Sequence, residues 1–337
     1  LNDAGERISD VDAIVTASVD LFDGKTASSI YITEVVGAVM KPETRIAGDG
    51  LFALVHAAMT ILSGQYNKVL VVAHSKASEA NLDKISNWTF DPVFQQPLGL
   101  TDSIALGLQA QAFLRRCPNS VGDEKFRAEL VAQLFNRDTN PIKNSSISGA
   151  LDTKTVLESA VVFSPLHELE INVPGDGAAA VLLEGGKTGG TELQGFGYCL
   201  DRHYLGDRDL SRSETLAKAV ERACLMAKIN QIRDEVDRCY WSLRSSVQMP
   251  LWAESAGIWS FKEGLRALLL KGNGCTCERS VEHPGFNAWN NLAPVTMGLQ
   301  RLICAVRDSK NQLNSGSALV HGCHGPAGQS QAVCLLK

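Results

Sequence analysis

The fold is decided by the stretch Arg45-Ile-Ala-Gly-Asp-Gly50, which leads directly into Leu51-Phe-Ala-Leu-Val-His-Ala-Ala-Met-Thr-Ile-Leu62. Apolar residues recur within 51–62 at the spacing of a buried helix, and the glycine-bearing turn before them is a helix start. Ser63-Gly64 ends that helix, and Lys68-Val-Leu-Val-Val-Ala73 is a continuous apolar run, typical of a strand covered on both faces. The sequence therefore predicts a turn, a buried helix and a central strand, in that order.

Strands and helices alternate along the rest of the chain. The hydrophobic patterns predict strands at 11–16, 192–199 and 234–240, helices at 28–39, 103–116, 124–136 and 213–228, and a terminal hairpin of 317–322 with 331–336. This alternation predicts an α/β protein whose sheets are covered on both faces.

A glycine-rich stretch, Glu184-Gly-Gly-Lys-Thr-Gly-Gly190, divides the chain into two halves. We expect an N-terminal half over 1–186, which includes an excursion over about 75–165, and a C-terminal half over 187–337. The excursion contains tryptophan, phenylalanine and proline residues, so we expect it to pack on the body of the protein instead of serving as a flexible linker.

The bulk composition excludes several classes of protein. The chain has 337 residues, 45% of them hydrophobic and 20% charged, with a formal net charge of −5, so it can bury a large core. It has no apolar run of the roughly 18 residues that a membrane helix needs, and no basic cluster typical of nucleic-acid binding. Its nine cysteines are scattered and odd in number, and Leu1–Glu6 does not begin a signal peptide. We therefore expect a cytoplasmic protein that binds neither membrane nor nucleic acid.

One group of residues has metal-ligand chemistry, namely Cys275-Thr-Cys277 with His283 close by in the sequence. Structural zinc sites use four ligands, most often with Cys-x-x-Cys spacing, whereas this group offers three ligands and Cys-x-Cys spacing. We therefore predict no metal site.

Three motifs resemble the thiolase superfamily. Ala47-Gly-Asp-Gly-Leu51 is similar to the Cys-x-Ser-Gly-Leu turn that opens the family's buried helix, and Asp176-Gly-Ala-Ala-Ala-Val181 is similar to the strand that closes its first half. Cys323–Gln329 resembles the family's glycine-rich terminal hairpin. The resemblance spans nearly the whole chain. It implies a thiolase-like, five-layered αβαβα fold made of two similar halves, and acyl-CoA carbon–carbon bond chemistry.

The resemblance also implies partners. Asp91-Pro-Val-Phe-Gln-Gln-Pro-Leu-Gly-Leu100 is similar to bacterial and archaeal thiolases that work with a small zinc-ribbon/OB-fold protein. Family members are usually dimers, so we expect this chain to pair with itself or with an active thiolase-like chain. The implied substrate is an acyl-CoA, a coenzyme A thioester, and no permanently bound cofactor is expected. Because family members normally begin with a further strand, we also expect residues to be missing before Leu1.

Two positions that carry catalytic groups in the family have lost them here. Ala47 stands where the family has its nucleophilic cysteine, and a methyl group cannot be acylated. Counting back from Gly298-Leu299 places Leu292 at the histidine of the family's Gly-His-Pro motif. We expect Asp49 to cap the helix that follows it and His283, which precedes a proline, to be a loop residue.

Two candidates lie on the strand predicted in the middle of the second half, which in the family ends in a polar residue that helps to hold the thioester oxygen. Asp237 is nearest that position, although a carboxylate opposes a developing enolate unless it is protonated or paired with Arg238. Tyr240 is either an acid/base group, as the resemblance to cysteine-free aldolases implies, or an aromatic core residue.

The terminal hairpin contains the third candidate group. Cys323 aligns approximately with the family's second cysteine, which moves a proton on the attacking carbon, and His321 and His324 flank it. A histidine close to a thiol can tune it or act itself near neutral pH. The alternative is a chance cluster in a chain with nine cysteines and seven histidines.

Three hypotheses about function follow. The first is a catalytically degenerate thiolase-like subunit that acts as a scaffold in a complex performing Claisen cleavage or condensation, which the losses at Ala47 and Leu292 favour. The second is a cysteine-independent aldolase that cleaves a β-hydroxyacyl-CoA with Tyr240, Cys323 or a hairpin histidine. The third, least supported, is a thiolase whose nucleophile comes from elsewhere. Turnover by the isolated chain separates the first two.

Overall fold

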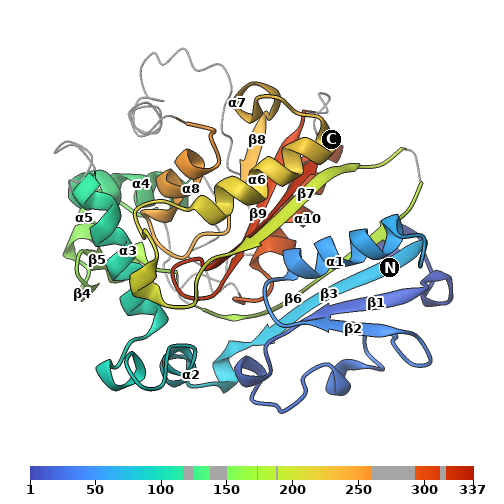
Figure 1. The fold of residues 1–337 in the computed structure, drawn as a ribbon, viewed down its shortest axis with the longest axis horizontal. Helices are drawn as coiled ribbons and strands as arrows, with labels where there is room; N and C mark the ends of the chain where they lie inside the picture. Colours follow the sequence, from blue (N-terminus) through green and yellow to red (C-terminus); the bar gives the residue numbers. More distant parts are fainter. Residues whose placement is uncertain (117–123, 137–149, 173, 187–188, 260–292, 312–315) are drawn as a thin grey trace.

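The computed structural model describes residues 1–116, 124–136, 150–172, 174–186, 189–259, 293–311 and 316–337 (Figure 1). Their strands form two four-stranded sheets and a small two-stranded one. Within these ranges, no helix has the length and apolar character needed to cross a membrane. The described ranges also hold no cluster of three or more side chains suited to a metal ion; Cys275, Cys277 and His283 lie outside them.

The first sheet has the strand order β2-β1-β3-β6. Its strands are β1 (Ala13–Ala17), β2 (Glu43–Ile46), β3 (Lys68–Lys76) and β6 (Asp176–Glu184). The first three run parallel to one another, and β6 runs antiparallel to β3. The central strand predicted from the run at 68–73 is therefore β3.

The second sheet repeats part of this arrangement, with the order β7-β10-β9-β8. Its strands are β7 (Leu193–Leu200), β8 (Arg238–Tyr240), β9 (Ala318–His324) and β10 (Ser330–Leu336). As β1 is parallel and β6 antiparallel to β3, so β8 is parallel and β10 antiparallel to β9. The two sheets therefore share the arrangement of three strands, β1-β3-β6 and β8-β9-β10, and differ in the edge to which the fourth strand is added. The predicted terminal hairpin is confirmed as β9 and β10.

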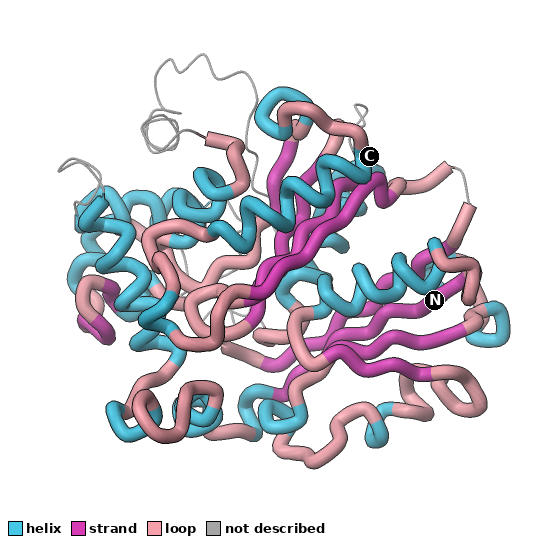
Figure 2. Tube along the Cα trace, viewed as in Figure 1, coloured by secondary structure: helices cyan, strands magenta, loops and turns pink. Residues whose placement is uncertain are grey.

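Two helices, α1 (Gly50–Leu62) and α10 (Met297–Asn311), lie between the two sheets (Figures 1 and 2). Leu54 of α1 and Leu299 of α10 share one core cluster with Val71 of the first sheet and Val320 of the second. Gly50 allows the close approach, because a Cβ atom there would lie 2.8 Å from the Cβ of Ala73 and 2.9 Å from that of Leu299. These helices form the central layer.

Different elements cover the outer faces. The second sheet is covered by α6 (Glu214–Ala227), α8 (Gln248–Ser255) and α3 (Asp102–Arg116), whose residues share its outer core cluster. The first sheet is covered by a loop that includes Val36 and Ala38. The helix predicted over 28–39 is wrong: only Ile30–Ile32 form a 3-10 turn, and Gly37 at φ 75° breaks the helical path.

The predicted excursion is ordered where it is described. It contains α2 (Leu82–Trp88), α3, α4 (Glu124–Asn136), α5 (Thr153–Glu158), β4 (Val161–Phe163) and β5 (Leu166–His167), while α7 (Ile232–Glu235) belongs to the second half. A buried ion pair joins Arg127 Nε to Glu170 Oε1 at 2.7 Å. Ser246, which follows β8, donates to the same carboxylate at 2.8 Å. The excursion is thereby attached to the segment after β8.

Candidate functional site

A cavity of about 570 Å³ lies where the excursion meets the end of β9. One part of its wall is apolar, with Val19, Leu21, Phe22, Ile85, Val162 and Met297. The rest carries polar and ionisable side chains, among them Asp102, Asn172, Arg244, Cys323 and His324. A mostly apolar cavity with a few converging polar groups is typical of a ligand site.

Cys323 lines this cavity at the end of β9. Its side chain is buried, and its Sγ–H donates to the carbonyl oxygen of Ser242 at 3.8 Å. Burial, and next the nearby Asp49 carboxylate, raise the pKa of the Cys323 thiol to about 12. The thiol is therefore neutral at physiological pH, which suits it to give a proton and makes it a poor nucleophile.

His324 lines the cavity next to Cys323. Burial lowers its pKa, and the positive charge of Arg244 lowers it further, so the imidazole is neutral and able to accept a proton. The ring lies against the turn that opens α1, because a Cβ on Gly48 would be 3.7 Å from its Cγ. The hairpin and the turn that contains Ala47 therefore meet at this point.

Arg244 follows β8 and reaches into the same cavity. Its guanidinium forms an ion pair with Asp102, the first residue of α3. A guanidinium has five N–H donors, and a single carboxylate can accept from only some of them, so several remain for a ligand. The sequence analysis missed both residues, because nothing in the sequence shows that the start of α3 faces the segment after β8.

Asn172 is another residue that the sequence analysis missed. Its backbone N–H donates to the carbonyl of Arg244 at 2.9 Å, and its Nδ2 donates to the carbonyl of Leu243 at 3.4 Å. Its Oδ1 is buried and has no hydrogen-bond partner among the described residues. An unpaired buried acceptor is unfavourable, so a donor group on a ligand would stabilise this side chain.

His321 does not line the cavity. It is fully buried, with ring centroids 5.5 Å from Trp241 and 5.6 Å from Trp252. Its Nδ1 accepts from the backbone N–H of Ser242 at 3.3 Å, so Nε2 is the nitrogen that donates to Gln331 Oε1 at 2.5 Å. Burial lowers its pKa to about 4. His321 is thus a neutral core residue that joins β9 to the segment after β8.

Tyr240 and Asp237 also lie outside the cavity. The Tyr240 hydroxyl donates to Asp308 Oδ2 at 2.9 Å, and its ring belongs to the core between the sheets. Asp237 precedes β8 and accepts from the backbone N–H of Ser317 at 2.8 Å. Neither residue lines the cavity that contains Cys323; the part of this region that does so is the segment after β8, which leads to Arg244.

The start of α1 contains Ala47 and Asp49. Ala47 is exposed and directly follows β2, and Leu292 lies outside the described residues. Asp49 is the helix cap that we predicted: its carboxylate accepts from Leu51 N at 2.9 Å and also from Gly298 N of α10 at 2.8 Å. Burial raises the pKa of Asp49 to about 7. Asp49 therefore joins the N-terminal ends of both central helices.

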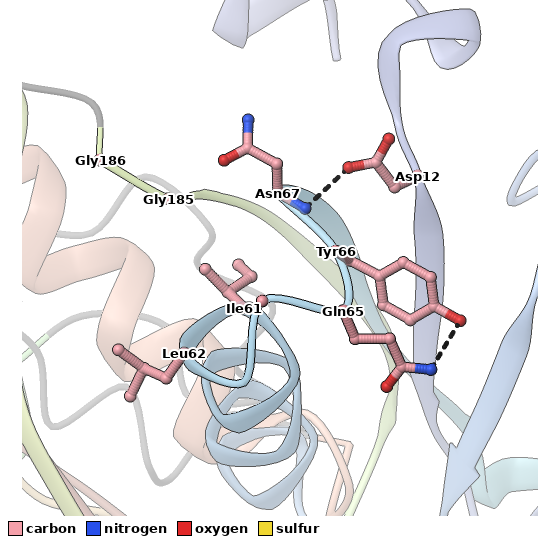
Figure 3. A pocket seen from close by; sticks show the side chains of 9 residues that line it. Asp12, Ile61, Leu62, Gln65, Tyr66, Asn67, Gly185 and Gly186 are labelled. Carbon is pink, nitrogen blue, oxygen red and sulfur yellow. Dashed lines mark hydrogen bonds between the residues drawn. The ribbon is translucent and has the colours of Figure 1, made fainter.

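A second hollow, of about 890 Å³, lies beside the start of β3 (Figure 3). Its polar residues bond to one another: Asn67 N–H donates to Asp12 Oδ2 at 2.9 Å, and Gln65 Nε2 donates to Tyr66 Oη at 3.2 Å. The described residues around it include no histidine, cysteine, lysine or arginine. It therefore offers less chemistry than the cavity at β9.

Comparison with known proteins gives matches among solved structures, whereas no protein-family model and no curated protein matches the chain. One structure, that of an Ltp2-ChsH2(DUF35) aldolase, aligns with 99% of this chain and 89% of its own, at a TM-score of 0.72 and 16% identity. A monomeric SCP2-thiolase-like protein type 1 from Mycobacterium smegmatis aligns with 98% of this chain and 68% of its own, at a TM-score of 0.68 and 15% identity. This chain has a thiolase-like fold. The predicted fold class is thereby confirmed.

Proposed function

We propose that this protein catalyses aldol-type cleavage or formation of the Cα–Cβ bond of a β-hydroxyacyl-CoA. The observation that carries the proposal is the cavity itself. It combines a neutral imidazole, a neutral thiol and a guanidinium on His324, Cys323 and Arg244. These are a proton acceptor, a proton donor and a group able to stabilise an enolate oxygen.

In the cleavage direction His324 removes the proton of the β-hydroxyl group. The Cα–Cβ bond then breaks, Cβ becomes the carbonyl carbon of an aldehyde or ketone, and the electron pair passes to the thioester as an enolate. Arg244 stabilises the enolate oxygen. The thiol of Cys323 gives its proton to Cα, and the proton on His324 returns to the Cys323 thiolate. The sequence of steps is redox-neutral, so it balances with the coenzyme A thioester as substrate and no additional cofactor.

This mechanism accounts for the residue at the start of α1. A thiolase reaction passes through an acylated thiolate, which Ala47 cannot form and which the raised pKa of Cys323 disfavours. The aldol route forms no acyl-enzyme, so neither property opposes it. One of the two structural relatives is named an aldolase, which is consistent with this route.

A second candidate is a subunit that assembles with another thiolase-like chain or with a small zinc-ribbon/OB-fold protein. It is favoured by exposed apolar residues in the loop beside β2, where Val35 is 86% and Met40 100% exposed. Among the described strands β2 pairs only with β1, so its outer edge is open to another chain. A second copy of this chain or a related one would cover both features.

The test is incubation of the purified chain with a panel of β-hydroxyacyl-CoA thioesters, followed by mass spectrometry of the products. We expect a shortened acyl-CoA and an equal amount of aldehyde or ketone. The control is the Asp152→Asn variant, which should cleave as the wild type does, because Asp152 caps α5 and does not line the cavity. If neither the chain alone nor the chain with its co-purifying partner cleaves any member of the panel, the aldolase proposal fails and the subunit candidate gains support.

A further inference from the structure

We infer that Gln109 and Gln248 form a relay of buried side-chain amides that positions Arg244 relative to the hairpin bearing Cys323 and His324. Its catalytic consequence rests on the proposed function, whereas its structural consequence does not. Gln109 lies on α3 and Gln248 begins α8, so the relay crosses two helices of the outer layer.

Three hydrogen bonds form the relay. The backbone N–H of Arg244 donates to Gln248 Oε1 at 2.7 Å, and Gln248 Nε2 donates to Gln109 Oε1 at 2.9 Å. Gln109 Nε2 then donates to the carbonyl oxygen of Ala327 at 3.0 Å. Both glutamines are almost completely inaccessible to solvent, Gln109 at 2% and Gln248 at 0% exposure. Water cannot replace these bonds without a rearrangement of the core.

The direction of the relay is determined at both ends. A backbone N–H can only donate, so it requires the oxygen of Gln248, and a carbonyl can only accept, so it requires the nitrogen of Gln109. Each amide is thereby oriented, and the bond between the two glutamines follows. Loss of either side chain would leave Arg244 N–H or the Ala327 carbonyl unpaired in the core.

The residue at the far end of the relay lies in a constrained turn. Ala327 has φ 49° between Gly325 at 79° and Gly328 at 67°, a left-handed path that is unfavourable for alanine. A Cβ on Gly328 would lie 2.7 Å from the Trp252 ring of α8, so the turn packs directly on the helix that carries Gln248. The relay therefore stabilises the turn that follows Cys323 and His324.

Arg244, at the other end of the relay, is held through both its side chain and its backbone. Asp102 pairs with the Arg244 side chain, and Gln109 is connected through Gln248 to the Arg244 backbone. Asp102 and Gln109 are seven residues apart on α3, a spacing that places both on one face of the helix. A single helix face thus sets the position of Arg244, and the same face reaches the hairpin turn.

The test measures the pKa of His324 by NMR titration of protein with 13C-labelled histidine, with His324→Gln used to assign its signal. Gln109→Met, Gln248→Met and the double variant remove relay bonds with little change in side-chain volume. The charged groups that act on His324 are Arg244, which lowers its pKa, and Asp102, which raises it. If Arg244 moves away, we expect the pKa of His324 to rise by roughly 0.3 for each ångström of added separation.

The double variant should shift this pKa no more than either single variant, because either one interrupts the relay. The matched control is Gln95→Met, which removes another buried glutamine whose Oε1 accepts from the backbone N–H of Asp91 at 3.3 Å and which lies outside the relay, the hairpin and the cavity lining. An unchanged pKa in the folded relay variants, or an equal rise in the control, would overturn the inference. If a methionine variant does not fold, Gln109→Asn keeps an uncharged amide but is one methylene group shorter, so it interrupts the relay without adding a charge that acts on His324.

Activity provides a separate measure. If the aldol reaction is found, we expect the relay variants to lower kcat about 10- to 100-fold, because small displacements of reacting groups have effects of this size. KM should change much less, since neither glutamine side chain lines the cavity. If the wild type cleaves no thioester, the proposed function fails, and the NMR titration still decides whether the relay exists.

Discussion

The two halves of this protein share the arrangement of three strands but differ in the side chains at the strand ends. In the first half, β2 leads through Ala47 and Asp49 into α1, and this turn presents no nucleophile or proton acceptor at its surface. In the second half, β9 ends in Cys323 and His324, both of which line the cavity. The difference shows that related strand ends carry different side chains in the two halves, with ionisable groups facing the cavity from the second half.

In the first half, the N-terminus of α1 is occupied by a carboxyl group. Such an end favours negative charge and can lower the pKa of a thiol. Here the charge is supplied by Asp49, whose two oxygens accept backbone N–H groups from α1 and α10. Gly298 and Gly322 leave room for it, since a Cβ at either would lie within 2.5 Å of Asp49 Oδ1. A feature suited to catalysis in one protein can therefore serve packing in another.

The largest effect that this comparison predicts is on His324. We expect His324→Ala to lower kcat for β-hydroxyacyl-CoA cleavage about 100- to 10,000-fold, the range for loss of a general base. Thermal unfolding should be nearly unchanged, because the described residues give this ring no hydrogen bond. A variant with full activity would mean that the second half is no more catalytic than the first.

The next effect is on Cys323. We expect Cys323→Ala to lower kcat by about 100-fold, the lower end of the range for a proton donor, because water entering the cavity can replace the thiol in part. Deuterium incorporation at Cα of the product, followed in D2O by mass spectrometry, measures the protonation step directly. Unchanged kcat together with unchanged stereochemistry at Cα would remove Cys323 from the mechanism.

The third effect is on stability. Asp49→Asn replaces one of two acceptor oxygens by an NH2 group that must face a backbone N–H donor. We expect a loss of about 1–3 kcal/mol in the free energy of unfolding, measured with urea. Asp152→Asn is the matched control, because Asp152 caps α5 by accepting from Thr155 N at 2.7 Å, bonds to only one helix and is more exposed. An equal loss in both variants would contradict the bridging role of Asp49.

The contribution of Asp49 to the free energy of unfolding should also depend on pH, in a direction that its raised pKa determines. The folded pKa of Asp49 is raised to about 7 from an ordinary 3.8, so between these values the folded protein binds a proton that the unfolded chain has released. Its contribution to stability therefore falls as pH rises from about 4 to about 7 and is constant above that. The difference between wild type and Asp49→Asn should be largest near pH 4. The pKa of Asp152 is lowered instead, so its contribution falls as pH decreases.

Much of the fold could be predicted from local patterns. The helix at 51–62, the strand at 68–73 and the terminal hairpin carry strong periodicity or long apolar runs, and the structure has them within a few residues. The helix expected over 28–39 failed because its apolar residues follow no single spacing and Gly37 interrupts it. Local signals of that kind are overridden by the need to cover Ile14 and Leu70 of the first sheet.

The site was harder to predict because its side chains come from segments that are far apart in the sequence and meet only in the folded protein. Cys323 and His324 are adjacent in sequence, so a local motif sufficed to find them. Asp102, Asn172 and Arg244 come from three separate segments, and no spacing connects them. Asp237 lies just before β8 and Tyr240 ends it, whereas Arg244, which lines the cavity, comes from the segment after that strand. Sequence alone predicted the chemistry of one wall and not its partners.

The smallest expected effect comes from placing a cysteine at position 47. Ala47→Cys places an exposed thiol at the N-terminus of α1, where we expect it to react with iodoacetamide faster than Cys323, whose pKa is raised to about 12. Cleavage of β-hydroxyacyl-CoA should change by no more than about twofold, because the aldol route uses no nucleophile at this position. The variant should also fail to cleave acetoacetyl-CoA with free coenzyme A, since the sequence resemblance places Leu292, which cannot accept a proton, at the position of the histidine that activates the thiolase nucleophile. Acquisition of that thiolysis, with acylation of the introduced thiol detected by intact-protein mass, would mean that the first half lacks a single side chain and that the two halves differ far less than their geometry indicates.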